Sequence, residues 1–191
     1  MRYLIIKSHP YAGSFNEGVA QTVIEAAKEK GHEVSEIDLV MDGFNPVMTG
    51  EDLKAWSQGQ SVDPLVKKYQ QKIEKADILV FPFPAWWGTM PAVLKGFCDK
   101  VLLPNWAYKK GAFGTLNGLL TTKKAIVINT TETPLWIFRL WFHNPVRGAF
   151  IKDTLHVCGI KVIKFKQFDH MASGSKERAE RKMAKVRKLI K

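Results

Sequence analysis

Long hydrophobic runs are absent from this sequence, and their absence argues against a membrane-spanning helix. A helix that crosses a bilayer needs roughly 20 consecutive apolar residues. The longest apolar runs here are the size of single strands, around residues 78–83 and 125–128. Residues 1–7 have too short an apolar core for a secretory signal peptide, and they lack a small-residue cleavage site. We therefore expect a cytoplasmic protein.

Cysteine is scarce as well, and its placement argues against metal chemistry. Cys98 and Cys158 are the only two, and each lies alone in an apolar stretch without CxxC spacing. Such residues are typical of core thiols. The sequence also has no other metal-ligand spacing and no set of residues that resembles a Ser/His/Asp triad. Hydrolases and metalloenzymes are thus disfavoured, and we predict no metal site.

Acidic residues are outnumbered, with 18 Asp and Glu against 29 Lys and Arg, which gives a net charge of +11. Residues 176–191 hold eight basic and two acidic side chains, so more than half of the excess lies in this one segment. Its apolar residues recur at helical spacing, which predicts a packed C-terminal helix with a solvated basic face. The alternative is a surface for nucleic acid or anionic lipid.

What is present is the composition of an ordinary globular domain. The 191 residues are 46% hydrophobic and 25% charged, and they contain neither internal repeats nor low-complexity tracts. This length suits one well-buried domain and is short for two. We therefore predict a single domain over residues 1–191.

Short apolar runs alternate with helical patterns along the chain. The predicted strands are 3–6, 34–40, 78–83, 125–128 and 161–168, and the predicted helices are 16–30, 62–75, 91–103, 149–157 and 176–190. Alternation of this kind implies parallel strands joined by right-handed crossovers. We predict an α/β fold, a doubly wound five-stranded parallel sheet with helices on both faces. The stretch 41–61 is expected to be irregular, and both 41–61 and 104–124 are expected to be long insertions.

Ligands of such sheets bind beyond the carboxyl ends of the strands, so the loops 8–16, 84–90 and 129–144 are of interest. In the first loop, Ser14 and Asn16 stand where a helix begins, so free backbone N–H groups and the helix dipole face the loop. Because a glycine precedes Ser14 and allows close backbone approach, these groups form an anion site. The alternative is ordinary N-capping by Ser14 or Asn16. The loop matches neither Walker A nor the GxGxxG fingerprint.

The second loop carries Trp86 and Trp87 between prolines, next to Gly88. Two tryptophans are costly to leave in water and usually face a flat group. A rigid loop whose N–H groups reach the edge of a planar heterocycle suits a flavin ring. Core packing or a dimer contact is the alternative.

The third loop turns polar directly after an apolar strand, beginning with Asn129, Thr130 and Thr131. Its hydroxyls and amides are suited to the polar edge of a ring. An N-cap cluster for a following helix is the alternative.

Together these residues give the sequence a resemblance to the flavodoxin-like NAD(P)H:quinone oxidoreductases, the DT-diaphorase type and its bacterial relatives. The resemblance runs from residue 3 to about residue 168, and its middle motif is fairly specific. The family's strand order, 2-1-3-4-5, is therefore expected here. The matching stretches are His9 with Ser14-Phe15-Asn16, Phe44-Asn45-Pro46, Phe83-Pro84-Ala85-Trp86-Trp87-Gly88, Pro91-Ala92-Val93-Leu94-Lys95-Gly96, Asp99-Lys100-Val101 through Ala107-Tyr108, Thr130-Thr131 and Leu155-His156-Val157-Cys158-Gly159.

The resemblance implies a flavin held without a covalent bond, FAD or alternatively FMN. NAD(P)H would donate two electrons and leave, and a quinone-like acceptor would then enter the same pocket in a ping-pong mechanism. A homodimer is also implied, because in the family a second subunit completes the pocket. The residues that the resemblance assigns to flavin binding are His9, Ser14, Phe15, Asn16, Pro84, Ala85, Trp86, Trp87, Gly88, Thr130, Thr131 and Glu132.

One departure from the family pattern lies in the third loop. The family often continues the two threonines with two glycines, whereas Glu132-Thr133-Pro134 stands here. The family's Tyr and His near the site of hydride transfer therefore have no certain counterpart. Trp136 and His143 are the candidates for that role.

Three other functions remain open at this point. A nucleotide-binding ancillary subunit of a membrane transporter would use the basic C-terminal segment as its contact surface. A flavodoxin-like electron carrier is disfavoured by the charge of +11, since such carriers tend to be acidic. Nucleic-acid binding is disfavoured because no aromatic stacking platform accompanies the basic helix. Membrane association is left open but is not expected.

Overall fold

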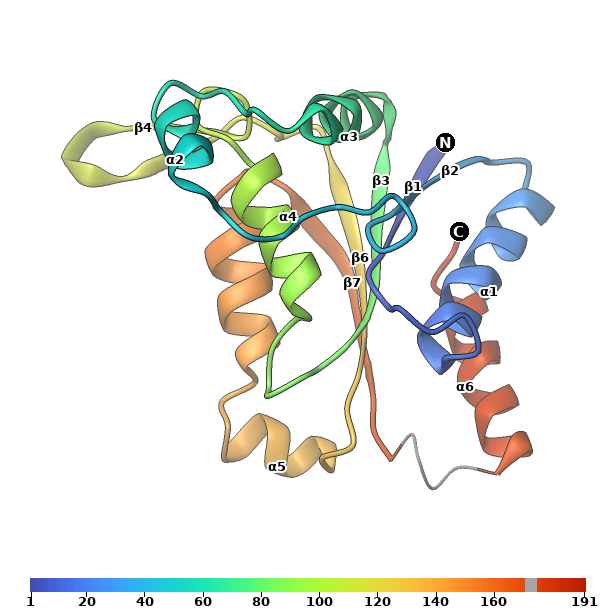
Figure 1. The fold of residues 1–191 in the computed structure, drawn as a ribbon. Helices are drawn as coiled ribbons and strands as arrows, with labels where there is room; N and C mark the ends of the chain where they lie inside the picture. Colours follow the sequence, from blue (N-terminus) through green and yellow to red (C-terminus); the bar gives the residue numbers. More distant parts are fainter. Residues whose placement is uncertain (171–174) are drawn as a thin grey trace.

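A five-stranded parallel sheet forms the centre of the computed structural model, which describes residues 1–170 and 175–191. The strand order is β2-β1-β3-β6-β7, so among these five the expected order 2-1-3-4-5 is confirmed (Figure 1). All neighbours in the sheet pair in parallel. The strands are β1 (Arg2–Lys7), β2 (Glu33–Asp38), β3 (Ile78–Pro84), β6 (Lys124–Thr130) and β7 (Lys161–Phe168).

Helices cover both faces of the sheet, as the α/β prediction requires (Figure 1). On one face lie α1 (Phe15–Glu29) and α6 (Lys176–Arg187). On the other lie α3 (Pro64–Lys75), α4 (Ala92–Val101) and a π-helix, η2 (Val146–His156). Each face therefore has its own apolar core.

The alternation of side chains along β1 shows how the two cores arise. Tyr3 and Ile5 pack toward α1 and α6, whereas Leu4 and Ile6 pack toward the opposite helices. The central strand β3 is buried over its whole length, as its continuous apolarity predicts. Within the described parts of the chain, no helix combines the length and the apolarity that crossing a bilayer demands.

The basic C-terminal helix packs as predicted. In α6 and the residues after it, Val186 and Ile190 are buried against α1. Arg187 extends across to Glu25 and Glu29 of α1. The packed face is therefore apolar, and most of the basic side chains of α6 stay in solvent.

Both cysteines are buried, in agreement with the sequence. Burial raises the pKa of the Cys158 thiol to about 11 and that of Cys98 still further. Neither thiol is ionised near neutral pH, so both are unreactive core residues.

Both long insertions contain short elements, which corrects the prediction that residues 41–61 are irregular. Residues 41–61 include α2 (Gly50–Trp56), which opens with a capping box between Thr49 and Asp52. Residues 104–124 include an antiparallel hairpin of β4 (Tyr108–Lys110) and β5 (Leu116–Gly118), with η1 (Ala112–Gly114) at its tip. Elements of three to seven residues are too short for periodicity to reveal.

Two further corrections concern the segment before β7. Part of the loop predicted over 129–144 forms α5 (Leu135–Leu140). The helix predicted over 149–157 begins three residues earlier, at Val146, and has π geometry. Both differences matter for function, because this segment lies beside one of the three candidate loops.

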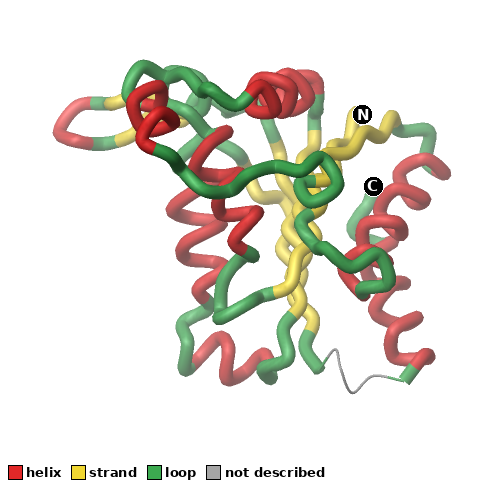
Figure 2. Tube along the Cα trace, viewed as in Figure 1, coloured by secondary structure: helices red, strands yellow, loops and turns green. Residues whose placement is uncertain are grey.

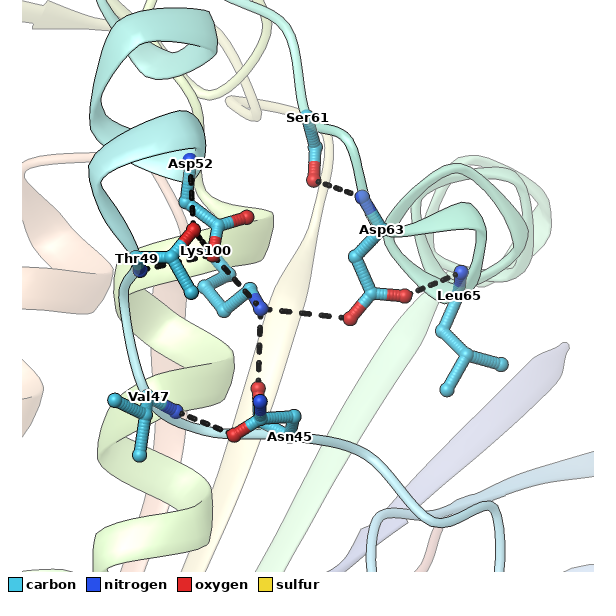
Figure 3. A network of polar contacts seen from close by, with 8 residues as sticks. All are labelled: Asn45, Val47, Thr49, Asp52, Ser61, Asp63, Leu65 and Lys100. Atoms are coloured by element: carbon cyan, nitrogen blue, oxygen red, sulfur yellow. Dashed lines mark hydrogen bonds and ion pairs between the residues drawn. The ribbon is translucent and has the colours of Figure 1, made fainter.

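A buried lysine holds the long segment after β2 against the sheet's helical layer (Figure 3). Lys100 of α4 lies 3.3 Å from Asp52 and 3.5 Å from Asp63, and its Nζ donates to the carbonyl of Asn45 at 3.2 Å. The side chains of Lys100 and Asp52 are only 4% and 5% exposed. Burial opposes ionisation of Asp52, but hydrogen bonds from Thr49 and the charge of Lys100 hold its pKa below the usual value.

We expect Lys100→Met to destabilise the protein by about 3–5 kcal/mol, because it leaves two carboxylates without their buried cation. Lys95→Met on the same helix is the matched control. Its ion pair with Asp99 is exposed, so the expected loss is below about 0.5 kcal/mol. Urea unfolding of both variants measures the two losses. Equal small losses would contradict a stabilising role for the buried charge.

Candidate functional site

The three loops singled out in the sequence meet at the carboxyl ends of neighbouring strands. They follow β1, β3 and β6, which lie side by side in the sheet (Figure 2). Asn16 Nδ2 donates to Thr130 Oγ1 at 3.0 Å, which joins the first loop to the third. The N–H of Ala85 donates to the carbonyl of Thr130 at 2.6 Å, which joins the second loop to the third. The loops therefore form one connected surface.

The first loop ends in the amino terminus of α1, where Ser14 is the N-cap residue. Ser14 Oγ accepts the N–H of Glu17 at 3.1 Å, so the capping alternative holds for Ser14. Asn16 is instead buried within the helix and bonded to Thr130. The amides of Phe15 and Asn16 belong to the first turn, where the helix offers them no acceptor. Ser14 still has its hydroxyl proton to donate, so capping and anion binding are compatible here.

A second polar group stands close to the start of this loop. Ser8, directly after β1, is 1% exposed, and its Oγ has no hydrogen-bond partner in the described portion of the chain. A buried hydroxyl without a partner is costly, so such a group needs an explanation. A ligand bound along this edge would supply one.

Aromatic contacts fix the other residues of the first loop. The His9 ring meets Trp86 edge-on at 5.8 Å, and His9 Nδ1 accepts the N–H of Tyr11 at 3.1 Å. Phe15 packs against Phe168 at 6.3 Å and so belongs to the core. His9 therefore connects the first and second loops, whereas Phe15 packs in the apolar core at the start of α1.

The second loop is a tight turn with its tip in solvent. Trp86 and Thr89 exchange backbone hydrogen bonds of 2.9 and 3.2 Å. The two residues between them, Trp87 and Gly88, have φ of 51° and 81°. Glycine adopts such angles freely, but for a bulky residue they are strained. The Trp87 side chain is nonetheless fully exposed.

A cavity of about 560 Å³ opens between the second and third loops. Its volume lies within the range of about 300–1,000 Å³ that is usual for small-molecule sites. Aromatic side chains and hydroxyl groups dominate its walls, a combination suited to a flat, partly polar molecule. The residues that line it are Ala85, Trp87, Gly88, Thr131, Glu132, Thr133, Phe138, Phe142 and Pro145.

Four of these wall residues were not among the predicted site residues: Thr133, Phe138, Phe142 and Pro145. The last three belong to α5 and the corner after it, a segment that was predicted to be a loop. The spacing of four between the two phenylalanines, after Pro134, was the available signal. The candidates chosen there instead, Trp136 and His143, do not line the cavity. Both side chains are exposed beside it.

Buried amides hold the corner that carries Pro145. Gln167 Nε2 donates to Asn129 Oδ1 at 3.1 Å, and Asn144 Nδ2 donates to Gln167 Oε1 at 2.9 Å. All three side chains are buried. Asn144 has a φ of 49°, so these bonds maintain a backbone conformation that is otherwise unfavourable. The cavity wall therefore depends on β6 and β7 beneath it.

The start of α5 is fixed by a carboxylate. Asp169 Oδ2 accepts the N–H of Leu135 at 2.9 Å. Burial opposes ionisation of Asp169, but this bond and the neighbouring His170 hold its pKa below the usual value. Lys182 of α6 donates to the carbonyl of Asp169 at 2.6 Å. The wall of the cavity is thus tied to α6 as well as to the sheet.

Known proteins resemble this chain over its whole length. The model of the family described as flavodoxin-like fold (Flavodoxin_2) matches residues 1–191. NAD(P)H dehydrogenase (quinone) 1 of Rattus norvegicus is 32% identical over 186 residues, which cover 85% of this chain and 66% of the rat protein. An uncharacterized NAD(P)H oxidoreductase of Haemophilus influenzae is 29% identical, covering 88% of this chain and 83% of that protein. This chain thus spans just under two thirds of the rat relative.

A solved structure gives the same result for the fold. The NAD(P)H:quinone oxidoreductase from Methanothermobacter marburgensis superposes with a TM-score of 0.87 at 26% identity. The superposition covers 99% of this chain and 96% of that one. The similarity therefore includes the three loops and the segment around α5.

We expect Gln167→Leu to cost about 1–3 kcal/mol of stability, because Asn129 Oδ1 and Asn144 Nδ2 lose the hydrogen bonds that Gln167 makes with them. Gln21→Leu on α1 serves as the control, since Gln21 is exposed and bonds only to its helix neighbour Glu25 among the described residues. Urea unfolding provides the comparison. A loss no larger than that of the control would show that the amide cluster contributes nothing to the corner.

Proposed function

This chain belongs to the flavodoxin-like family, and from that premise we propose that it is a flavin-dependent NAD(P)H oxidoreductase that passes two electrons to a quinone or a similar acceptor. The observation that carries the proposal is the cavity between the second and third loops, beside an amino-terminal helix end. The names of the rat and methanogen relatives support the same activity.

The residues fit a flavin in the following way. The first turn of α1 and Ser14 would bind phosphate, as helix amino termini do. The orphaned hydroxyl of Ser8 lies along the same edge and would gain a partner. The backbone of residues 85–88 would bind the edge of the ring, and Thr131 would contact it from the third loop. Bound there, the flavin supplies the hydride chemistry, whereas the protein orients it.

Asn16 and Thr130 have a positioning role in this proposal. Their side chains bond to each other and are both buried, so they hold the first and third loops at a fixed separation. Glu132 lines the cavity where relatives often have glycine, and its carboxylate would add negative charge to the wall. We propose FAD as the cofactor, with FMN as the alternative, and NAD(P)H as the donor.

The donor and the acceptor would use the cavity in turn. One cavity is lined by residues of both loops, and its walls include the exposed side chains of Trp87 and Phe142. Aromatic walls of this kind accept the flat rings of nicotinamide and quinone alike. We propose a ping-pong mechanism in the cytoplasm, in which the first product leaves before the acceptor binds.

We also propose a homodimer. The β4–β5 hairpin projects away from the sheet (Figure 1), and Phe113 at its tip is fully exposed with a φ of 55°. An aromatic side chain held in solvent at the end of a hairpin is suited to insertion into a second copy. The resemblance, in which a partner subunit completes the pocket, supports the same arrangement.

Steady-state kinetics test the activity and its order together. The flavin-loaded protein should oxidise NAD(P)H only when a quinone is supplied. Double-reciprocal plots at several quinone concentrations should give parallel lines, as a ping-pong mechanism requires. Intersecting lines would contradict a shared cavity. Absence of quinone-dependent oxidation would contradict the proposed function itself.

The phosphate site is tested by Ser14→Asp. Aspartate is as good an N-cap as serine, so α1 should remain folded. Its charge would face the flavin phosphate, and we expect the affinity for flavin to fall by about tenfold or more.

Ser175→Asp is the matched control, because Ser175 caps α6 in the same way and lies outside the three loops. Absorbance of the bound flavin and its release on dilution give the affinity of each variant. Equal retention of flavin by both variants would contradict the role proposed for Ser14.

A further inference from the structure

One charged side chain lines the cavity between the second and third loops. Among the described residues of the cavity wall, Glu132 alone carries a charge, and the others are aromatic, small or hydroxylated. Glu132 is exposed, so its carboxylate needs no buried counter-ion. A charge in the wall of a cavity acts on a bound ligand more strongly than a charge on an open surface, because less water lies between the two. Glu132 is therefore in a position to select ligands by their charge.

The backbone holds Glu132 in place on both sides. The N–H of Thr131 donates to the carbonyl of Phe168 at 2.9 Å, which continues the pairing of β6 with β7 beyond the end of β6. The N–H of Thr133 donates to Thr131 Oγ1 at 3.2 Å and closes a tight turn around Glu132. Because Thr131 is itself buried, this turn is anchored in the protein. The Glu132 side chain thus starts from a fixed point of the cavity wall.

Cations occur near Glu132, but they do not belong to the cavity wall. The charge of Lys182 on α6 interacts with that of Glu132, and Lys182 Nζ donates to the carbonyls of Asp169 and His170 at 2.6 and 3.4 Å. Asp169 places a second carboxylate near Lys182. No lysine or arginine in the described part of the chain lines the cavity. A ligand in the cavity therefore lies against the carboxylate, whereas these cations act on it from a greater distance.

The aromatic side chains of the wall act in the same direction as the carboxylate. Trp87, Phe138 and Phe142 line the cavity together with Glu132. The face of an aromatic ring attracts a cation, and tryptophan does so most strongly. A flat cation would gain from the carboxylate and from the rings at once. A flat anion would be opposed by both.

We propose that Glu132 makes this cavity selective for flat cationic rings over neutral ones, and for neutral rings over anionic ones. The proposal rests on the proposed function and deepens it, because it names the charge class of the ligands that the same cavity takes. Glu132 acts directly on the ligand that lies against it, so it is a specificity-determining residue.

The donor half of the proposed reaction produces such a cation. When the nicotinamide ring of NAD(P)H gives up a hydride, which is a proton with two electrons, the ring is oxidised to a positively charged pyridinium. The hydride passes to the flavin, which is reduced. Because positive charge grows on the ring during the transfer, a carboxylate beside it stabilises the transition state more than the neutral donor. Glu132 therefore favours the donation of the hydride.

For the acceptor half, the same charge sets a limit. Neutral quinones enter the cavity without electrostatic repulsion, whereas quinones that bear a carboxylate or a sulfonate are repelled by Glu132. Acceptors with a positive charge are attracted. The acceptor of this protein accordingly belongs to the neutral or the cationic class.

Three probes that share one pyridine ring test this selectivity without turnover. They are 1-methylnicotinamide, which is cationic, nicotinamide, which is neutral, and nicotinate, which is anionic. Ligand-observed NMR registers weak binding and gives the dissociation constant of each probe for the flavin-loaded protein. We expect the cation to bind about tenfold more tightly than the anion at low salt, with the neutral ring in between, and this difference to shrink at high salt.

Variants of Glu132 assign the selectivity to its charge. Glu132→Gln keeps the shape of the side chain, and we expect the cation and the anion to bind it within about threefold of each other, the remainder coming from the aromatic walls. Glu132→Asp keeps the charge and should retain the ranking. Glu180→Gln is the matched control, because Glu180 is exposed on α6 and does not line this cavity. Rapid mixing with NAD(P)H should show slower flavin reduction in Glu132→Gln than in this control.

The outcomes distinguish this proposal from the proposed function. Equal affinity of the unaltered protein for the three probes would overturn the proposal, because the charge of Glu132 would then be neutralised within the assembled protein. An unchanged ranking after Glu132→Gln would overturn it as well, but neither result would contradict quinone-dependent oxidation of NAD(P)H. A ranking that is lost in Glu132→Gln and kept in Glu132→Asp and Glu180→Gln would support the proposal, even if no quinone-dependent oxidation were found.

Discussion

Parallel pairing of β1, β3 and β6 is the constraint on which the rest of the molecule depends. Because the three strands run in one direction, the loops after them meet at one edge of the sheet. The bond from Ala85 N–H to the carbonyl of Thr130 continues the sheet into the loops by one residue. The Asn16–Thr130 bond connects the amino terminus of α1 to the same place. The amino terminus of α1 and the cavity are adjacent for this reason.

The cavity wall is stabilised by polar groups that do not themselves line the cavity. Gln167, Asn129 and Asn144 bond to one another beneath the corner after α5, and Asp169 fixes the first turn of that helix. These bonds hold a corner in which His143 and Asn144 both have positive φ. The apolar wall residues Phe138, Phe142 and Pro145 owe their position to this buried polar support.

The α5 segment also shows how one short helix can face two environments. Phe138 closes the core, and Phe142 lines the cavity. Trp136, Leu140 and Trp141 remain exposed, although their transfer out of water would be favourable.

The sequence by itself determined the fold class and the location of the three loops, because strand-sized apolar runs and helical periodicity are local signals. It also located Ser14 at the start of a helix and residues 84–88 at the end of a strand. The strand order came instead from the resemblance of the sequence to a known family. Only the tertiary structure decided that Phe138, Phe142 and Pro145 form a wall, and that Trp136 and His143 lie outside it. The same holds for Lys100, whose partners are 37 and 48 residues away in the chain. Contacts of that kind arise when separate elements pack together, and no local pattern of residues records them.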